Sequence, residues 1–118
     1  MILVDTSVWV DHSRKGDQER RSLLDEGSVL CHPFVIGELA CGNLKNRGEI
    51  LRLLEALPTS TVASHQEVLH LLSEQKLHGK GLGWIDMHLL ASALLSKSRL
   101  WTTDKTLAKA ARALEAGT

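Results

Sequence analysis

Four acidic side chains stand where the active site of an α/β protein would be expected. Asp5 follows a short apolar segment that predicts a buried strand, and Asp104 follows the last predicted strand. Ligand sites in open α/β sheets lie just beyond the carboxyl ends of the strands, so both acids fall where such a site would form. Glu38 and Asp86 lie instead in predicted helices, close to the apolar face that each helix must bury.

The chemistry of four converging carboxylates points to a metal ion. Carboxylates in one cleft repel one another, and burial adds to the cost of their charges. A divalent cation relieves both penalties. Because the ligand atoms would all be oxygens, Mg²⁺ or Mn²⁺ suits the set better than Zn²⁺. Such a centre polarises a phosphate and lowers the pKa of a bound water, which predicts metal-assisted hydrolysis of a phosphodiester bond.

Each acid also has a structural explanation, which the residues alone leave open. Asp5 and Asp104 are suited to cap the helices that follow them. Glu38 and Asp86 would then be ordinary, partly exposed acids on helices. The functional interpretation therefore requires a fold that brings all four acids together.

Apolar periodicity and capping signals predict short strands that alternate with helices. The expected strands are residues 1–4, 28–31, 59–63 and 99–102. The expected helices are one that ends near residue 13, then residues 17–26, 33–43, 47–57, 65–77, 84–97 and 105–114, with a glycine-rich loop at 78–83. This alternation predicts an α/β fold, a three-layer α/β/α sandwich around a short, mainly parallel sheet of four to five strands. Residues 1–118 are expected to form a single domain.

The helix at 84–97 carries Asp86 on its apolar side. Asp86 shares a face with Leu89, Leu90 and Ala93 by helical spacing. An acid on such a stripe is costly unless it is paired, protonated or bound to a cation. A different, more polar face is expected to carry His88, Ser92 and Ser96.

Competing chemistries lack their motifs in this chain. No Gly-x-Ser-x-Gly elbow marks a serine hydrolase. The loop at 78–83 neither follows a strand nor ends in Gly-Lys-Ser/Thr, as a Walker loop does. A phosphoaspartate phosphatase would have an acid where Ser7 stands, and a receiver domain would have a Lys where Thr103 and Asp104 follow the last strand. The six histidines form no HxxxH or HxH pair, so each is expected to be a surface or structural residue.

Composition narrows the class of protein further. The 14 Lys and Arg residues balance the 14 Asp and Glu residues, which disfavours a strongly basic, non-specific nucleic-acid binder. Three Trp, one Phe and no Tyr argue against a surface of stacked aromatic platforms. Cys31 and Cys41 form no CxxC pair and are expected to be buried free thiols. Without a basic leader or an apolar stretch of membrane-spanning length, the chain is expected to be cytoplasmic.

The four acids lie in short segments that occur in a recognisable order. These are Val4-Asp5-Thr6-Ser7-Val8, Glu38-Leu39-Ala40-Cys41-Gly42, Asp86-Met87-His88-Leu89-Leu90-Ala91 and Thr102-Thr103-Asp104. Together they resemble the motifs of the PIN-domain ribonucleases, and most closely those of the VapC toxins of bacterial VapBC toxin–antitoxin modules. The resemblance runs from the first residues to the last helix. It implies an endoribonuclease that depends on Mg²⁺, with Mn²⁺ able to substitute.

The resemblance also implies roles for particular residues. The acidic metal-binding and catalytic set would be Asp5, Glu38, Asp86 and Asp104, of which Asp104 is the least uniform member. Ser7 and Thr103 would be hydroxyl groups that orient an acid, a water or a phosphate. Contacts with the RNA backbone would fall to Arg14, Lys15, Lys45, Arg47, Lys80 and Lys105.

Partners follow from the same resemblance. VapC-like toxins cut structured RNA, commonly tRNA or ribosomal RNA, within single-stranded loops. They usually form homodimers, and a VapB antitoxin silences them by placing its tail in the acidic cleft. Apolar helices beside the site would provide the antitoxin groove. The alternative is a catalytically inactive PIN-like module that binds RNA or a protein partner.

Overall fold

Strand β1, Ile2–Val4, occupies the centre of a parallel sheet in the computed structural model, which describes residues 1–25 and 28–117. Strand β2, Val29–Leu30, pairs with one edge of β1, and strand β3, Arg99–Trp101, pairs with the other. The register places Val4 opposite Trp101. Because the strands are parallel, their carboxyl ends meet at one edge of the sheet, as the placement of the acids requires.

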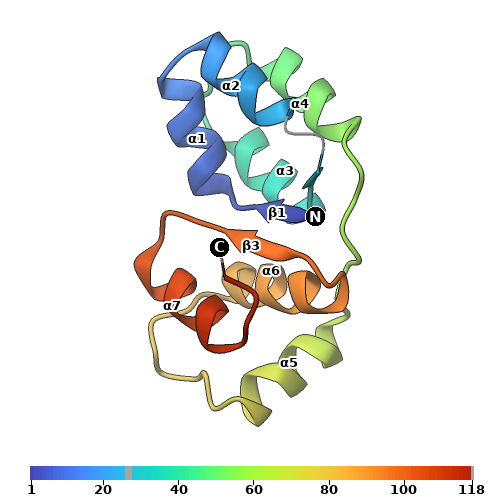
Figure 1. Ribbon diagram of the computed structural model, residues 1–118, viewed down its shortest axis with the longest axis vertical. Coiled ribbons are helices and arrows are strands. Elements are labelled where there is room, and N and C mark those ends of the chain that lie inside the picture. The colour runs from blue at the N-terminus through green and yellow to red at the C-terminus, as the bar shows by residue number, and fades with distance from the viewer. Residues whose placement is uncertain (26–27, 118) are drawn as a thin grey trace.

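Helices cover the sheet on both sides, which confirms the predicted α/β sandwich. In the described residues they are α1 Thr6–Arg14, α2 Asp17–Leu24, α3 Pro33–Cys41, α4 Arg47–Glu55, α5 His65–Glu74, α6 Trp84–Leu95 and α7 Lys105–Ala113. Helices α1 to α4 lie above the strands in Figure 1, and α5 to α7 lie below them. None of the helices that the structure describes has the length and hydrophobicity needed to span a lipid bilayer.

The sheet is narrower than predicted. Within the described ranges it has three strands rather than four or five, and residues 59–63 form no strand. Single parallel bridges extend the sheet at its two edges, one between Cys31 and Thr59 and one between Leu100 and Gly117. The predicted fourth strand is therefore reduced to one bridge.

Side chains of α6 and of its C-cap residue explain why the segment at 59–63 leaves the sheet. The N–H of Thr61 donates to Ser96 Oγ at 2.8 Å, and the N–H of Ala63 donates to Ser92 Oγ at 3.2 Å. These backbone groups are thus satisfied by helix hydroxyls instead of by a neighbouring strand. A pattern of β-branched residues could not reveal this competition.

Most predicted helices form with ends two or three residues shorter. The predicted capping box is confirmed, since Ser64 Oγ accepts the N–H of Glu67 at 3.1 Å and the Glu67 carboxylate accepts the N–H of Ser64 at 2.8 Å. Helix α2 ends at Leu24, and the predicted end at Glu26 with Gly27 as its C-terminal residue lies outside the described residues.

Helix α6 is buried almost all round. Every residue from 87 to 93 is buried, including His88 and Ser92, so the polar face that carries them is covered by protein. The reason is that α6 packs against α5 on one side and against β1 and β3 on another. A helix packed between α5 and the sheet has little solvent-exposed face to offer.

The two cysteines are free thiols, as predicted, but they differ in burial. Cys31 is buried, and burial raises the pKa of its thiol to about 11. Cys41 is exposed, which corrects the expectation that both lie in the core. Helix α3 buries Val35 and Leu39, and Cys41 follows two residues later on another face.

A buried histidine joins the two helical layers. His32 caps α3, and its Nδ1 accepts the N–H of Phe34 at 3.0 Å. Its Nε2 therefore carries the proton and donates to Ser92 Oγ at 3.2 Å. Burial, with a smaller contribution from His88, lowers the pKa of His32 to about 4. The ring is neutral at physiological pH and serves as a structural link.

Acidification from pH 7 to pH 4.5 is expected to lower the free energy of unfolding. An unfolded histidine binds a proton near pH 6.5, whereas His32 in the fold remains neutral down to about pH 4. Between pH 6.5 and pH 4.5 the unfolded state therefore binds one more proton than the folded state. As the pH is lowered, His32 reduces the free energy of unfolding by roughly 1–3 kcal/mol. Urea unfolding at several pH values measures the effect.

Matched variants assign the effect to the buried ring. His32→Gln should flatten the pH dependence, while His70→Gln, at an exposed position of α5, should leave it as it is in the wild type. An unaltered slope in His32→Gln would contradict the assignment.

Candidate active site

Asp5 lies at the junction of β1 and α1 with 7% of its surface exposed. Its Oδ1 accepts the N–H of Thr6 at 2.8 Å, which caps α1. Its Oδ2 accepts two hydroxyl groups, Ser7 Oγ at 2.8 Å and Thr102 Oγ1 at 2.7 Å. Three donors thus fix the carboxylate, so capping and a site role are compatible for the same side chain.

The hydroxyl that reaches Asp5 from beyond the end of β3 belongs to Thr102. Because Val4 is opposite Trp101, the residues that follow them, Asp5 and Thr102, also meet across the sheet. The exposed Thr103 contributes its backbone N–H, which donates to Ser7 Oγ at 3.1 Å. The sequence could have indicated Thr102 only through the strand register, which no local motif supplies.

Glu38 is joined to the same site through α1. Its Oε1 accepts the hydroxyl of Thr6 at 2.7 Å, and Thr6 is the residue next to Asp5. Thr6 was not predicted as a site residue, although it stands beside Asp5 in the motif. The bond places an exposed acid of α3 beside the start of α1.

Asp104 is exposed and joined to Asp5 from the other side. Its N–H donates to Thr102 Oγ1 at 3.1 Å, and Thr102 in turn donates to Asp5. Asp104 also caps α7, because its Oδ1 accepts the N–H of Thr106 at 2.9 Å and of Leu107 at 3.1 Å. Like Asp5, Asp104 therefore both caps a helix and takes part in the hydrogen bonds of the candidate site.

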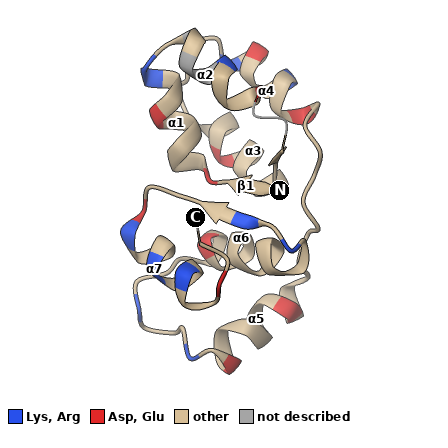
Figure 2. Cartoon of the chain, in the orientation of Figure 1, with Lys and Arg blue, Asp and Glu red and all other residues tan. Residues whose placement is uncertain are grey.

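Asp86 is held in the first turn of α6. Its Oδ2 accepts the N–H of Gly83 at 2.9 Å. Burial raises the pKa of Asp86, the Gly83 bond lowers it, and the charges of Asp104 and Asp5 raise it further. These repulsions mean that the three aspartates share one electrostatic environment. In Figure 2, acidic segments on α3 and α6 lie on either side of β1 and β3.

The four acids suit a hard divalent cation by chemistry, but their side chains are not gathered around one point. Within residues 1–25 and 28–117, no group of three or more His, Cys, Asp and Glu side chains is arranged to hold a metal ion. Protein donors instead occupy oxygens of each acid. The fit rests on two observations: the donors are all carboxylate oxygens, and Asp86 is destabilised as an anion by its acidic neighbours.

The predicted RNA-contact residues fall into three groups. Arg14 and Lys45 line a cavity of about 500 Å³ that also includes Thr6 and Glu38. Lys80 and Lys105 line another of about 550 Å³. These two pairs therefore stand on different sides of the acids.

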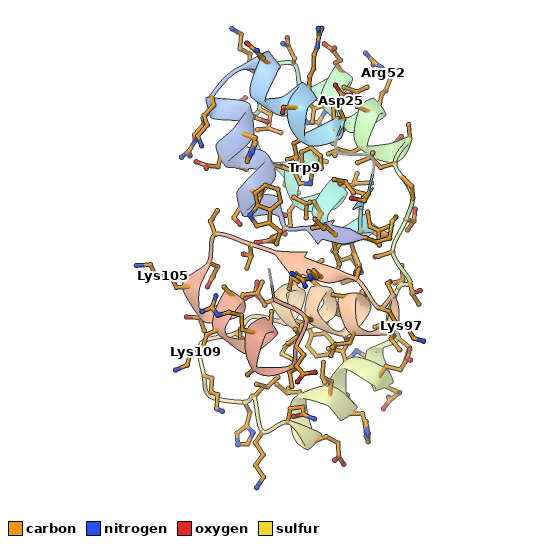
Figure 3. The ribbon with its side chains drawn as sticks, in the orientation of Figure 1. Trp9, Asp25, Arg52, Lys97, Lys105 and Lys109 are labelled. Carbon is orange, nitrogen blue, oxygen red and sulfur yellow. The ribbon has the colours of Figure 1, made fainter. Side chains whose placement is uncertain are left out.

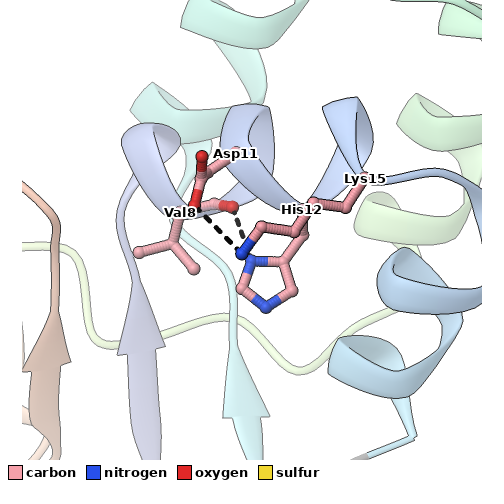
Figure 4. Close-up of polar contacts among 4 residues, drawn as sticks. All are labelled: Val8, Asp11, His12 and Lys15. Atoms are coloured by element: carbon pink, nitrogen blue, oxygen red, sulfur yellow. Dashed lines mark hydrogen bonds and ion pairs between the residues drawn. The ribbon is translucent and has the colours of Figure 1, made fainter.

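The remaining two cations, Lys15 and Arg47, contact residues close to them in the sequence. Lys15 pairs with Asp11 at 3.6 Å, one turn along α1, where His12 Nδ1 also lies 3.0 Å from the carbonyl oxygen of Val8 (Figure 4). Arg47 Nε donates to the carbonyl oxygen of Ala40 at 2.9 Å, near the end of α3. The exposed Lys15 pair is weak, so it does not withdraw that charge from other partners.

The shared electrostatics of the acids can be tested without any metal. In the metal-free protein with EDTA, the pKa of Asp86 is expected to exceed that of an ordinary aspartate, and Asp104→Asn should lower it by removing a like charge. Asn is also a good helix cap, so the fold should persist. Titration of the ¹³C-labelled carboxyl carbon by NMR measures both values. An unchanged pKa in the variant would show that the two acids do not interact.

Comparison with known proteins identifies the family. The PIN domain family matches residues 2–113, which is nearly the whole chain. Ribonuclease VapC32, from two strains of Mycobacterium tuberculosis, is 49% identical to this chain over 108 residues. The alignment covers 91% of this chain and 87% of that protein. The predicted family and fold are thereby confirmed, and the chain belongs to the PIN-domain family as a VapC-like member.

Proposed function

We propose that this protein is an endoribonuclease toxin of a VapBC module that uses Mg²⁺, or Mn²⁺ in its place, to hydrolyse phosphodiester bonds. The observation that carries the proposal is the hydroxyl network at Asp5. Thr6 joins Asp5 to Glu38, and Thr102 joins it to Asp104. The similarity to a protein named as a ribonuclease supports the same activity.

The four acids, Asp5, Glu38, Asp86 and Asp104, would hold the ion. A bound cation of this kind supplies a polarised phosphate and a water of lowered pKa. Ser7 and Thr102 fix the orientation of the Asp5 carboxylate, and the N–H of Gly83 fixes that of Asp86. Preorganised carboxylates of this kind need little rearrangement during the reaction.

Attack by water in line with the leaving oxygen would leave a 5′-phosphate and a 3′-hydroxyl. A 2′-hydroxyl attack would need a His or Lys acid–base pair beside the acids. In the described part of the chain, the hydrogen bonds of the four acids come from hydroxyl and backbone N–H groups. This environment favours hydrolysis by water.

The proposed substrate is structured RNA, cut within single-stranded loops of tRNA or ribosomal RNA, in the cytoplasm. The protein would act as a homodimer and would form larger assemblies with a VapB antitoxin. The cavity between α1 and α3 has apolar walls from Val10, Leu39 and Leu44, and it reaches Glu38. An amphipathic antitoxin segment seated there would cover the acidic site.

Replacing Asp5 is expected to abolish cleavage. Asp5→Asn keeps a side chain that caps a helix but removes the charge, so cleavage of total RNA with Mg²⁺ should fall by about 100-fold or more, equivalent to several kcal/mol. The matched control is Asp25→Asn, an exposed acid at the far end of the molecule in Figure 3, which should retain activity. EDTA should stop cleavage by the wild type. Cleavage that survives both EDTA and Asp5→Asn contradicts a metal–carboxylate mechanism.

The inactive PIN-like module is the rival function, and it is favoured by the finding that no three His, Cys, Asp or Glu side chains of the described residues are placed to hold a metal ion. Calorimetric titration of antitoxin-free protein with Mn²⁺ distinguishes the two. We expect binding below millimolar concentration that weakens in Asp86→Asn. Absence of binding at millimolar Mn²⁺ would support the inactive module.

A further inference from the structure

A groove between the loop at 77–82 and helix α7 carries three lysines. Lys80 comes from the loop, and Lys105 and Lys109 come from α7. Leu82 and Ala110 contribute an apolar floor, and the cavity measures about 550 Å³. We call this surface the lysine groove.

The three lysines have no acidic partner in the described residues. The one side-chain ion pair there joins Lys15 to Asp11, and no acid lines the groove. Lys105 and Lys109 project from α7 in the same general direction in Figure 3. Since the chain as a whole is neutral, three unpaired cations around one groove are a local excess of positive charge. Such an excess attracts a polyanion.

Both walls of the groove end at acids of the candidate active site. The loop leads into Gly83, whose N–H holds Asp86. Helix α7 begins at Asp104, which accepts the N–H of Thr106, itself a wall residue of the groove. The lysine groove therefore opens beside Asp86 and Asp104.

The backbone of the loop holds Lys80 in place. Gly79 and Gly81 flank it with φ angles of +71° and +83°, a region that side chains other than glycine rarely adopt. A Cβ at Gly81 would lie 3.8 Å from Thr106 Cγ2, so the loop runs close to α7. This conformation keeps Lys80 on the same groove as Lys105 and Lys109.

We propose that the lysine groove binds the phosphodiester backbone of the RNA on one side of the cleaved bond. The inference rests on the proposed function and extends it by giving the substrate a path away from the acids. A polyanion beside four carboxylates is repelled, and cations along its path offset that repulsion. An acidic protein segment is the other polyanion that the groove would attract. The position of the groove beside the acids favours RNA.

The test removes two charges from the groove and compares the result with removal of two charges elsewhere. The groove variant is Lys80→Gln with Lys109→Gln, and the control is Arg21→Gln with Arg52→Gln. All four residues are exposed, and Arg52 lies at the opposite end of the molecule from Lys109 in Figure 3. Fluorescence anisotropy with a labelled 20-nucleotide single-stranded RNA, in EDTA to prevent cleavage, gives the affinity at several KCl concentrations.

The groove variant should bind RNA about tenfold more weakly at 0.1 M KCl. The slope of log K against log salt should become shallower by about 1.4, because each lost phosphate contact on a single strand contributes roughly 0.7. The control should keep the wild-type slope, and Lys80→Arg with Lys109→Arg should keep both slope and affinity. An unchanged slope in the groove variant, or an equal loss in the control, overturns the inference.

Further measurements separate this inference from the proposed function. If wild type cleaves RNA with Mg²⁺ but the groove variant keeps its salt slope, the groove inference fails and the function stands. If wild type binds RNA through the groove without cleaving it, the groove stands and the function fails. If wild type does not bind RNA, both fail. Binding of the groove variant to polyglutamate is measured as well. If this variant loses polyglutamate binding but keeps RNA binding, the groove is assigned to an acidic protein segment and the inference is overturned.

Discussion

The pairing of Asp5 with Thr102 across the sheet is the contact on which the site depends. Strand β1 delivers Asp5 and strand β3 delivers Thr102, and the parallel register sets them opposite each other. Thr102 also accepts the N–H of Asp104, so the one hydroxyl links the first and last acids of the chain. A shift of one residue in the β1–β3 register would send these side chains to opposite faces and separate them.

The same region shows how a chain of zero net charge can contain a local group of acids. Burial, with smaller contributions from the charges of Asp104 and Asp5, raises the pKa of Asp86, so the fold holds these acids near one another against their repulsion. Their positions at the starts of helices hold them there. Asp5 and Asp104 cap α1 and α7, and Asp86 lies in the first turn of α6. Partial positive charge at helix N-termini stabilises carboxylates in such positions. The cations stand apart, in the lysine groove and around the α1–α3 cavity.

Local signals in the sequence predicted most of the fold. The alternation of strands and helices, the Ser64 capping box and the helix start after Asp104 depend on neighbouring residues, and the structure has them. The prediction of a strand at 59–63 was wrong because Ser92 and Ser96, some thirty residues later in the chain, accept N–H groups of this segment. The burial of His88 was missed for a similar reason, since it depends on packing of α6 against α5 and the sheet.

For the candidate site, the sequence indicates four acids and Ser7, but it does not indicate the hydroxyls of Thr6 and Thr102 that bond to two of these acids. Thr102 and Thr6 act through contacts across the sheet and between α1 and α3, which appear only when the register and helix packing are fixed. The resemblance to the family named Thr103, and the structure adds Thr102, whose hydroxyl donates to Asp5 because the two residues meet across the sheet.

The hydrogen bonds divide the oxygens of the aspartates in a consistent way. One oxygen of each accepts backbone N–H groups: Oδ1 of Asp5, Oδ2 of Asp86 and Oδ1 of Asp104. Backbone donors are fixed by the fold, so these oxygens anchor the side chains. The second oxygen of Asp5 is held only by hydroxyls, which can rotate to new partners. Because one oxygen anchors the Asp5 carboxylate, the other oxygen can exchange a hydroxyl donor for a ligand. A side chain that caps a helix can in this way also serve a site.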